Sequence, residues 1–328
     1  MTDTYHMFAS DEPPEIQVHS HDRYHAVLKA CAVLPPILTA IVHPVDEFVL
    51  ASLVNAAKEN LITPLLIGPA ARIRDVAERA ALDISSWDII DVKHSHAAAE
   101  KAVELAGAGS VEAIMKGSLH TEELLSPVVA SASGLRTERR LSHSYVMDTA
   151  GYHKWLIITD AVVNIAPDLS VKADICRNAA DVWRALSDES RLPKIAVLAA
   201  VELVNPKMQA TLDAAALSKM AERAQITGCI IDGPLGFDNA ISRSAAEKKG
   251  IVSAVAGDPD ILLAPDIEAA NILAKQLTFI NRADAAGIVM GGRVPIILAS
   301  RADGQRTRIL SCALAVLVLE ARRSGRIK

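Results

Sequence analysis

The segment GCIIDGPLGFDNAIS occupies residues 228–242. An apolar run leads into Asp232, a Gly-Pro pair follows, and Asp238 precedes a helical pattern that begins near Ala240. This pattern predicts a buried strand that delivers two carboxylates to its carboxyl end, the end at which open α/β sheets bind ligands. Ordinary turn and helix-capping chemistry is the alternative, because acids and Gly-Pro pairs are common between a strand and a helix.

Outward from this segment, short apolar runs alternate with helical patterns in both directions. The expected strands are 39–43, 64–67, 87–92, 112–115, 194–199, 229–231, 261–263 and 294–299. Repeated strand–helix units predict an α/β fold with mainly parallel sheets flanked by helices. Two strands at 141–147 and 155–159 follow each other closely, which predicts an antiparallel addition and a domain boundary near residue 135.

Length and composition set limits on the class of protein. The chain has 328 residues, 51% apolar but 3% aromatic, which predicts an aliphatic core in one large or two medium domains. A net charge of −5 argues against a nucleic-acid surface. We expect residues 1–19, which are polar and aperiodic, to form a mobile tail.

The sequence also predicts the protein's surroundings. Its four cysteines have no zinc or redox spacing, so we expect no bound metal and a reducing, cytoplasmic location. No signal peptide is recognisable. The longest apolar run, Ile309–Leu319, is shorter than the roughly 20 residues that cross a bilayer, so no membrane contact is expected.

The segment KGSLHT, residues 116–121, is the first candidate binding motif. It follows an expected strand and opens an expected helix, where Gly117, Ser118 and Thr121 would let N–H groups and hydroxyls approach an anion. Lys116 and His120 flank these small residues. The motif is neither a P-loop nor a dinucleotide fingerprint, and simple capping by Ser118 or Thr121 is the alternative.

Two further groups carry charge near expected strand ends. Ser300, Arg301 and Asp303 follow the strand at 294–299, and together they could bind a phosphate or polarise a carbonyl and accept a proton. Arg139 and Arg140 belong to a basic cluster beside the expected boundary, where guanidinium groups suit phosphate. A surface salt bridge and a solvated loop are the respective alternatives.

These motifs occur in an order that resembles the phosphate acetyl/butyryltransferase family over about residues 25–325. The resemblance rests on the segments KGSLHT (116–121), RRLSH (139–143), DGPL with DNAIS (232–235 and 238–242), PDIEA with Asn271 (265–269), and SRAD (300–303). The details resemble the phosphotransbutyrylase-like branch more than typical phosphotransacetylases.

The resemblance implies a fold like that of the isocitrate and isopropylmalate dehydrogenases. It implies one α/β domain from residues 1–135 plus 288–328, a second from 136–287, an active site in the cleft between them, and a homodimer. The implied reaction interconverts short-chain acyl-CoA plus phosphate with acyl phosphate plus CoA. Coenzyme A is then a substrate, and no bound cofactor is expected.

The resemblance also implies residue roles. Ser300 and Arg301 would contact the thioester or phosphate, and Asp303 is the nearest candidate for the base that deprotonates CoA, because residues 304–307 contain no acid. Lys116, Gly117, Ser118, His120, Thr121, Arg139, Arg140, Asp232, Pro234 and Asp238 are the candidate phosphate- and CoA-binding residues. Related enzymes carry an arginine where this chain has Ser126, and Arg139 or Arg140 would supply the missing charge.

Three other functions stay open at this point. A ping-pong transferase would use Cys229, beside the 228–242 segment, as nucleophile, but no histidine is adjacent. A catalytically silent CoA- or acyl-binding subunit would explain the missing acid after Arg301. A metal-dependent hydroxyacid dehydrogenase shares the expected architecture. The sequence does not fix the acyl chain length.

Overall fold

The computed structural model describes residues 20–187, 190–300 and 302–327. In this part of the chain, eleven strands form one sheet in the order β3-β2-β1-β4-β11-β10-β5-β6-β9-β7-β8. From one edge to the other they are β3 (Ile89–Asp91), β2 (Ile62–Gly68), β1 (Ile37–Val42), β4 (Ala113–Lys116), β11 (Ile296–Ile297), β10 (Asp284–Met290), β5 (Ser142–Asp148), β6 (Leu156–Thr159), β9 (Ile261–Leu263), β7 (Lys194–Leu198) and β8 (Ile230–Leu235).

The strands fall into two parallel groups joined by antiparallel strands. Strands β3, β2, β1, β4 and β11 run parallel to one another, as do β6, β9, β7 and β8. Between the groups, β10 pairs antiparallel with both β11 and β5, and β5 pairs antiparallel with β6. The α/β fold with a large, mainly parallel sheet and an antiparallel addition at β5 and β6 is therefore confirmed.

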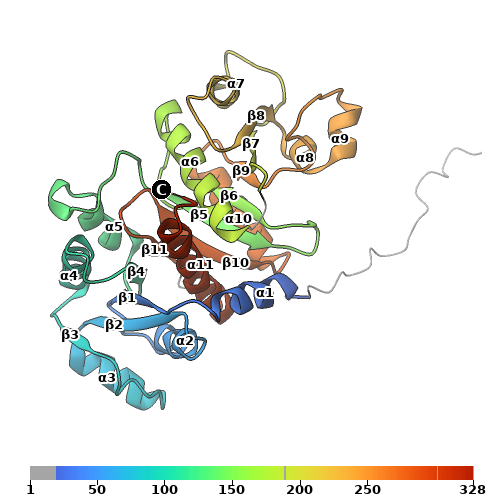
Figure 1. Cartoon of the computed structure of the whole chain (residues 1–328). Helices are drawn as coiled ribbons and strands as arrows, with labels where there is room; N and C mark the ends of the chain where they lie inside the picture. The colour runs from blue at the N-terminus through green and yellow to red at the C-terminus, as the bar shows by residue number, and fades with distance from the viewer. Residues whose placement is uncertain (1–19, 188–189, 301, 328) are drawn as a thin grey trace, which may run out of the picture.

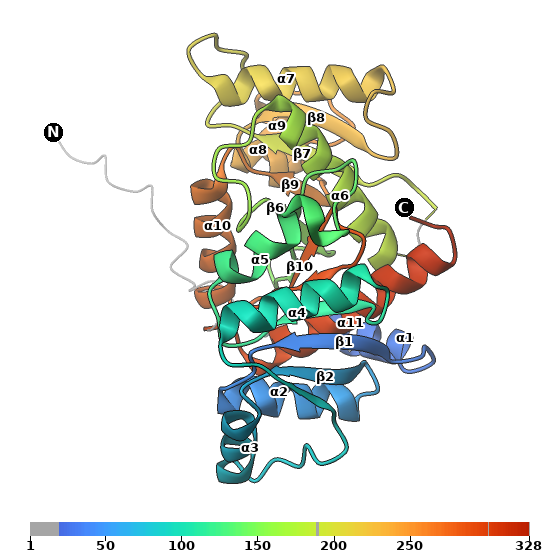
Figure 2. The ribbon, with the colours of Figure 1, turned by 90° about the vertical axis from the view of Figure 1, so that its left-hand side faces the viewer.

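Helices cover both faces of the sheet (Figures 1 and 2). On one face a single apolar cluster runs across both strand groups, beneath α1 (Asp22–Cys31), α2 (Glu47–Lys58), α3 (Ala70–Arg79), α6 (Leu169–Leu186), α7 (Gln209–Glu222) and α11 (Gln305–Arg323). The central part of this face is filled by α11, which packs on β10 and α6. Its alanine, leucine and valine residues are almost all buried.

On the other face the core is divided into two clusters. One lies beneath α4 (Ser95–Gly107) and α5 (Thr121–Val129), which is followed by a short 3-10 helix, Ser131–Ser133. The other lies beneath α8 (Phe237–Ile241), α9 (Arg243–Lys248) and α10 (Ile267–Phe279). We call the line between the two clusters the seam; Val162 packs against both. In Figure 2, α4 and α5 lie in front and α10 lies at the left.

The central strand β10 is absent from the sequence prediction. Its sequence, Asp-Ala-Ala-Gly followed by Ile-Val-Met, starts with small residues that do not alternate with polar ones. A Cβ atom on Gly287 would lie 2.2 Å from the Leu298 carbonyl oxygen, so this position requires glycine. The residues of β10 are therefore small because neighbouring backbones pack closely, and the usual alternation of apolar and polar side chains is missing.

The strand at the start of residues 228–242 is longer than predicted. The interpretation of Gly233-Pro234 as a turn is wrong, because β8 continues through both residues to Leu235, with a register shift against β7. Proline is tolerated because β8 is an edge strand that, among the described residues, has no strand partner on its outer side. Only Asp238 lies beyond the strand, in the first turn of α8.

The predicted division into 1–135 plus 288–328 and 136–287 stays a prediction. Its second boundary falls inside β10, so the two expected domains share one sheet. The expected mobile tail, residues 1–19, lies outside the described residues.

Candidate active site

The segment after β11 forms a tight turn at the seam. We call residues 298–300 and 302–308 the junction segment; Arg301, a predicted catalytic residue, lies outside the described residues. The Ser300 N–H donates to Asp303 Oδ2 at 2.6 Å, and the Asp303 N–H donates back to the Ser300 carbonyl at 3.1 Å. Because β11 is only two residues long, these reciprocal bonds, rather than strand pairing, fix the backbone at Ser300.

Asp303 also joins the two sides of the seam. Its side chain is 2% exposed, and Oδ1 lies 3.2 Å from Lys275 Nζ on α10. Lys275 is placed over the rings of Tyr145 and Phe279, 5.8 Å and 5.6 Å from their centres. Both carboxylate oxygens of Asp303 therefore already accept hydrogen bonds, one from the backbone and one from the opposite side of the seam.

Arg308, in the first turns of α11, lies beneath the same turn. Its Nη2 donates to the Ser300 carbonyl at 3.0 Å, and its guanidinium lies 5.4 Å from the centre of the Phe48 ring. The residue is 2% exposed, and burial lowers the pKa of its guanidinium. Within the described chain, Nε and Nη1 have no hydrogen-bond partner, which is costly for a buried cation.

His143 on β5 lies at the seam beside Leu298. It is fully buried, and a Cβ atom on Gly287 would approach both His143 Nε2 and the Leu298 carbonyl. Desolvation lowers the pKa of His143 to about 3, although the nearby Leu298 carbonyl opposes part of this shift. Neither ring nitrogen makes a hydrogen bond of ordinary geometry to a described residue, so the seam contains a neutral imidazole.

The KGSLHT motif lies next to the junction segment, because β4 and β11 are neighbouring parallel strands. Lys116 is buried at the end of β4, and Gly117 must be glycine because a Cβ atom would lie 2.3 Å from the Val42 carbonyl oxygen. The predicted alternative of capping does not describe α5, whose N-cap is His120 without a side-chain bond. Instead, the Ser118 hydroxyl is buried and unpaired among the described residues.

The two predicted arginines lie at the start of β5. Arg139 is engaged with α6, where its Nη1 lies 2.7 Å from Asp181 Oδ2. The Arg140 N–H donates to Asp174 on α6. In the described part of the chain no ion pair is found for the Arg140 guanidinium.

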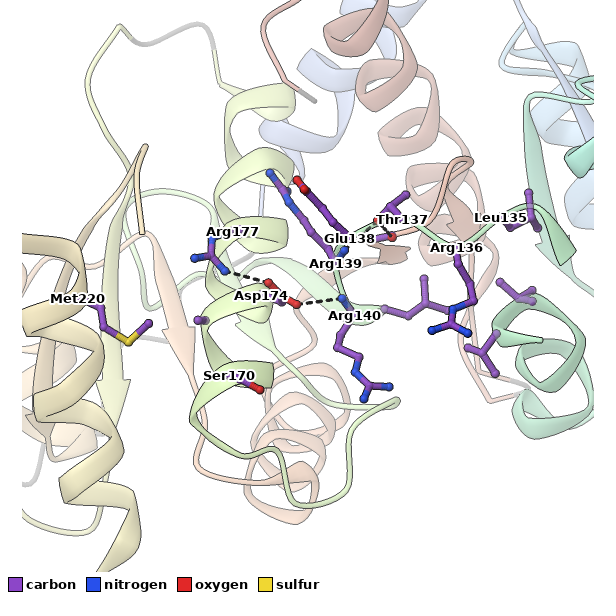
Figure 3. A pocket seen from close by; sticks show the side chains of 15 residues that line it. Leu135, Arg136, Thr137, Glu138, Arg139, Arg140, Ser170, Asp174, Arg177 and Met220 are labelled. Carbon is purple, nitrogen blue, oxygen red and sulfur yellow. Dashed lines mark hydrogen bonds and ion pairs between the residues drawn. The ribbon is translucent and has the colours of Figure 1, made fainter. Parts of the chain in front are cut away.

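These arginines line a bay of about 610 Å³ (Figure 3). In Figure 3, Arg136 and Arg140 lie in the space between α6 and the α5 side, while Arg177 bonds to Asp174. The bay has a basic lining, as phosphate groups require. None of the described residues around Ser300 lines it, so Arg140 and Ser300 belong to separate parts of the surface.

The remaining predicted residues lie at the far edge of the sheet. Asp232 Oδ1 accepts the N–H of Gly233, and Pro234 is buried within β8. Asp238 is 58% exposed and pairs with Lys249 at 3.0 Å; hydrogen bonding to Lys249 lowers the pKa of Asp238. Five strands lie between β8 and β11 in the sheet. The structure therefore brings KGSLHT and Ser300 together but not these three residues.

Cys229 does not resemble an activated nucleophile. It is 7% exposed at the start of the edge strand, and burial raises the pKa of its thiol to about 11. A ping-pong mechanism through Cys229 therefore lacks the thiolate nucleophile that it would need near neutral pH.

Among the described residues, no group of three or more His, Cys, Asp or Glu side chains is arranged to hold a metal ion. No helix in the same residues is long and apolar enough to cross a bilayer.

With this geometry in view, comparison with known proteins identifies the class. Residues 95–316 match the family model described as phosphate acetyl/butaryl transferase. A phosphate acetyltransferase from Rhizobium meliloti is 52% identical over 305 residues, which covers 93% of this chain and 96% of the relative. A phosphate butyryltransferase from Clostridium beijerinckii is 39% identical, with 90% and 97% covered.

A solved structure agrees with these relatives. The branched-chain phosphotransacylase from Enterococcus faecalis V583 superposes with a TM-score of 0.74 at 28% identity, covering 86% of this chain and 99% of that one. The chain belongs to the phosphate acetyl/butyryltransferase family. The predicted family and enzyme class, an acyltransferase, are confirmed.

Proposed function

We propose that the protein interconverts short-chain acyl-CoA and phosphate with acyl phosphate and CoA, by direct transfer in a ternary complex. One observation carries the proposal. Because β4 and β11 pair in parallel, the KGSLHT and Ser300 motifs lie side by side at the carboxyl ends of these two strands. Two neighbouring carboxyl-terminal strand ends, one followed by the Ser118 hydroxyl, which is unpaired among the described residues, and by the start of α5, form a site of the kind that α/β sheets use for ligands.

In the proposed site, different residues bind different groups of the substrate. The unpaired Ser118 hydroxyl and the start of α5 lie where a phosphate group would be bound, with Lys116 at the end of β4. Ser300 would contact the reacting group from β11. Arg301 would stabilise the charge that develops on the carbonyl oxygen.

In the proposed step, the CoA thiolate attacks the carbonyl carbon of the acyl phosphate. A carbon–sulfur bond forms, the carbon–oxygen bond to phosphate breaks, and phosphate leaves with the electron pair. The thiol has to lose its proton before or during the attack, because a thiol with a pKa near 8.5 is only a few per cent ionised at pH 7. Asp303 is the carboxylate that the sequence predicts for this task.

The bay around Arg140 is the proposed site for another part of CoA. Its basic lining would attract the phosphates of the nucleotide end. Arg140, rather than Arg139, is the better candidate, because Arg139 is already paired with Asp181. Binding roles for Asp232, Pro234 and Asp238 stay predictions, as do the homodimer and the cytoplasmic location.

Phosphate-dependent release of thiol from acetyl-, propionyl- and butyryl-CoA tests the function. We expect turnover with at least one of them, and at least a tenfold loss in Ser300→Ala and in Arg301→Ala, because both residues would contact the reacting group. Cys229→Ala serves as the control and should retain its activity. Absence of turnover with all three substrates, combined with measurable CoA binding, would favour the silent binding subunit instead.

A further inference from the structure

Charged side chains hold the backbone of Ser300, two of them directly and a third through one of these two. Asp303 accepts its N–H, Arg308 donates to its carbonyl, and Lys275 pairs with Asp303 from α10. We call Lys275, Asp303 and Arg308 the Ser300 clamp. Two of its members belong to the chain after β11, and the third crosses the seam from the other apolar cluster.

The buried charges of the clamp cost more folding free energy than packing at this place would require. Asp303 and Arg308 are 3% and 2% exposed, and two Arg308 nitrogens have no partner in the described chain. Buried charges rarely gain net stability over apolar side chains of the same size. A fold that needed only packing at this place would use leucine or methionine, so the charges indicate a requirement for exact backbone placement.

The geometry also limits what Asp303 can do. A carboxylate that removes the thiol proton needs a free oxygen facing the substrate. Asp303 instead directs one oxygen to the Ser300 N–H and the other to Lys275. Its contacts are those of a residue that fixes a turn.

We propose that Lys275 and Arg308 are positioning residues of the acyl-transfer reaction, Arg308 acting directly on the Ser300 peptide and Lys275 acting through Asp303. The inference rests on the proposed function and adds residues that the sequence motifs do not contain. Lys275 ties the turn to α10, so Ser300 keeps a fixed place relative to both sides of the seam. Asp303 is a member of this clamp rather than the base.

The test uses four variants of the full chain. Lys275→Met removes the cross-seam ion pair but keeps an unbranched side chain over the rings. Lys275→Arg preserves the charge. Asp303→Asn keeps an acceptor for the Ser300 N–H, and the Lys275→Met/Asp303→Asn double variant removes the pair. Lys219→Met is the matched control, because Lys219 forms an exposed ion pair with Glu222 on α7.

Each variant is assayed in the direction from acyl phosphate and CoA, together with thermal unfolding. We expect Lys275→Met to lose about 100-fold in kcat, the size of effect that a misplacement near 1 Å produces, with KM changed by less than about threefold. Lys275→Arg should recover most of the rate, and the double variant should be no slower than the slower single variant, because the two residues act as one pair. Unchanged kcat in a folded Lys275→Met would overturn the proposal.

The pH profile separates positioning from proton transfer. For a positioning residue, the ratio of Asp303→Asn to wild-type kcat stays constant from pH 6 to 8.5. If Asp303 were the base, the variant's rate would climb about tenfold per pH unit as the thiol ionises and would approach the wild type. That rise would overturn the role assigned to Asp303. An inactive wild-type protein, in contrast, would refute the proposed function itself.

Discussion

Two acid-containing regions of this molecule look alike in sequence and differ in the structure. The edge segment, residues 228–242, presents Asp238 in an exposed ion pair at the outermost strand, whereas the junction segment holds Asp303 almost fully buried between two apolar clusters. Water surrounds the carboxylate of Asp238, whereas protein surrounds that of Asp303; the two lysine partners are about equally exposed, at 34% and 31%. Whether an acid is buried deeply enough to fix the backbone of a site depends on where its strand lies in the sheet. The number of acids in the local sequence motif does not decide it.

The largest expected effect concerns Arg308. Replacement by methionine removes the donor to the Ser300 carbonyl, and kcat should fall by about 100-fold. The melting temperature should stay the same or rise, since the change removes a buried charge, two of whose nitrogens have no hydrogen-bond partner among the described residues. Steady-state kinetics and thermal unfolding measure both.

Arg306→Met is the control for this variant. Arg306 lies on the same helix, and its side chain is 54% exposed, so kcat should change by less than about twofold. Wild-type activity in Arg308→Met would show that the guanidinium does not hold Ser300.

A second prediction concerns the pH dependence of stability at the seam. The folded-state pKa of His143 is about 3, below its ordinary value of 6.5, so the unfolded chain binds the proton more readily. The folded state therefore loses stability as pH falls through 6.5, by about 1.4 kcal/mol per unit until about pH 3.

The difference between wild type and His143→Gln isolates this contribution from other titrating groups. The wild type should lose about 3 kcal/mol more than the variant between pH 7 and pH 4.5, measured by urea unfolding. If the free energy of unfolding fell equally with pH in the two proteins, the pKa of His143 in the folded state would be close to its ordinary value.

The smallest effect is expected at the edge segment. Asp238→Asn breaks an exposed pair with Lys249, and such pairs contribute little. KM for acyl-CoA should stay within about twofold of the wild type. A tenfold rise in KM would instead assign the edge segment to substrate binding, as the sequence predicts, and would weaken the contrast between the two regions.

Much of the fold could be predicted from the sequence because most of its strands are apolar runs bounded by turns. The β1, β4 and β5 predictions agree with the structure within a few residues. The strand β10 could not be found, because its alanines and Gly287 are selected by close backbone contacts that no local pattern reports. The turn predicted at Gly233-Pro234 failed because an edge strand tolerates proline.

At the candidate site, too, the sequence predicts contiguous motifs but not contacts between distant segments. KGSLHT and Ser300 were recognised because each motif is contiguous, and their neighbouring strands bring them together. Lys275 and Arg308 are absent from the sequence prediction, and His143 enters it only as part of the RRLSH segment without a role of its own, because the roles of all three depend on contacts between distant segments. One signal was available: Arg308 directly precedes the apolar run of α11 and is the charged residue among those that the helix buries, where a charge is rare unless it is paired.

Exchange of labelled phosphate tests direct transfer in a ternary complex most directly. The enzyme is incubated with acetyl phosphate and [³²P]phosphate, with and without CoA, and label entering acetyl phosphate is measured. The account predicts no exchange without CoA and rapid exchange when CoA is added. Label that enters acetyl phosphate in the absence of CoA would reveal an acyl-enzyme intermediate and would contradict the account.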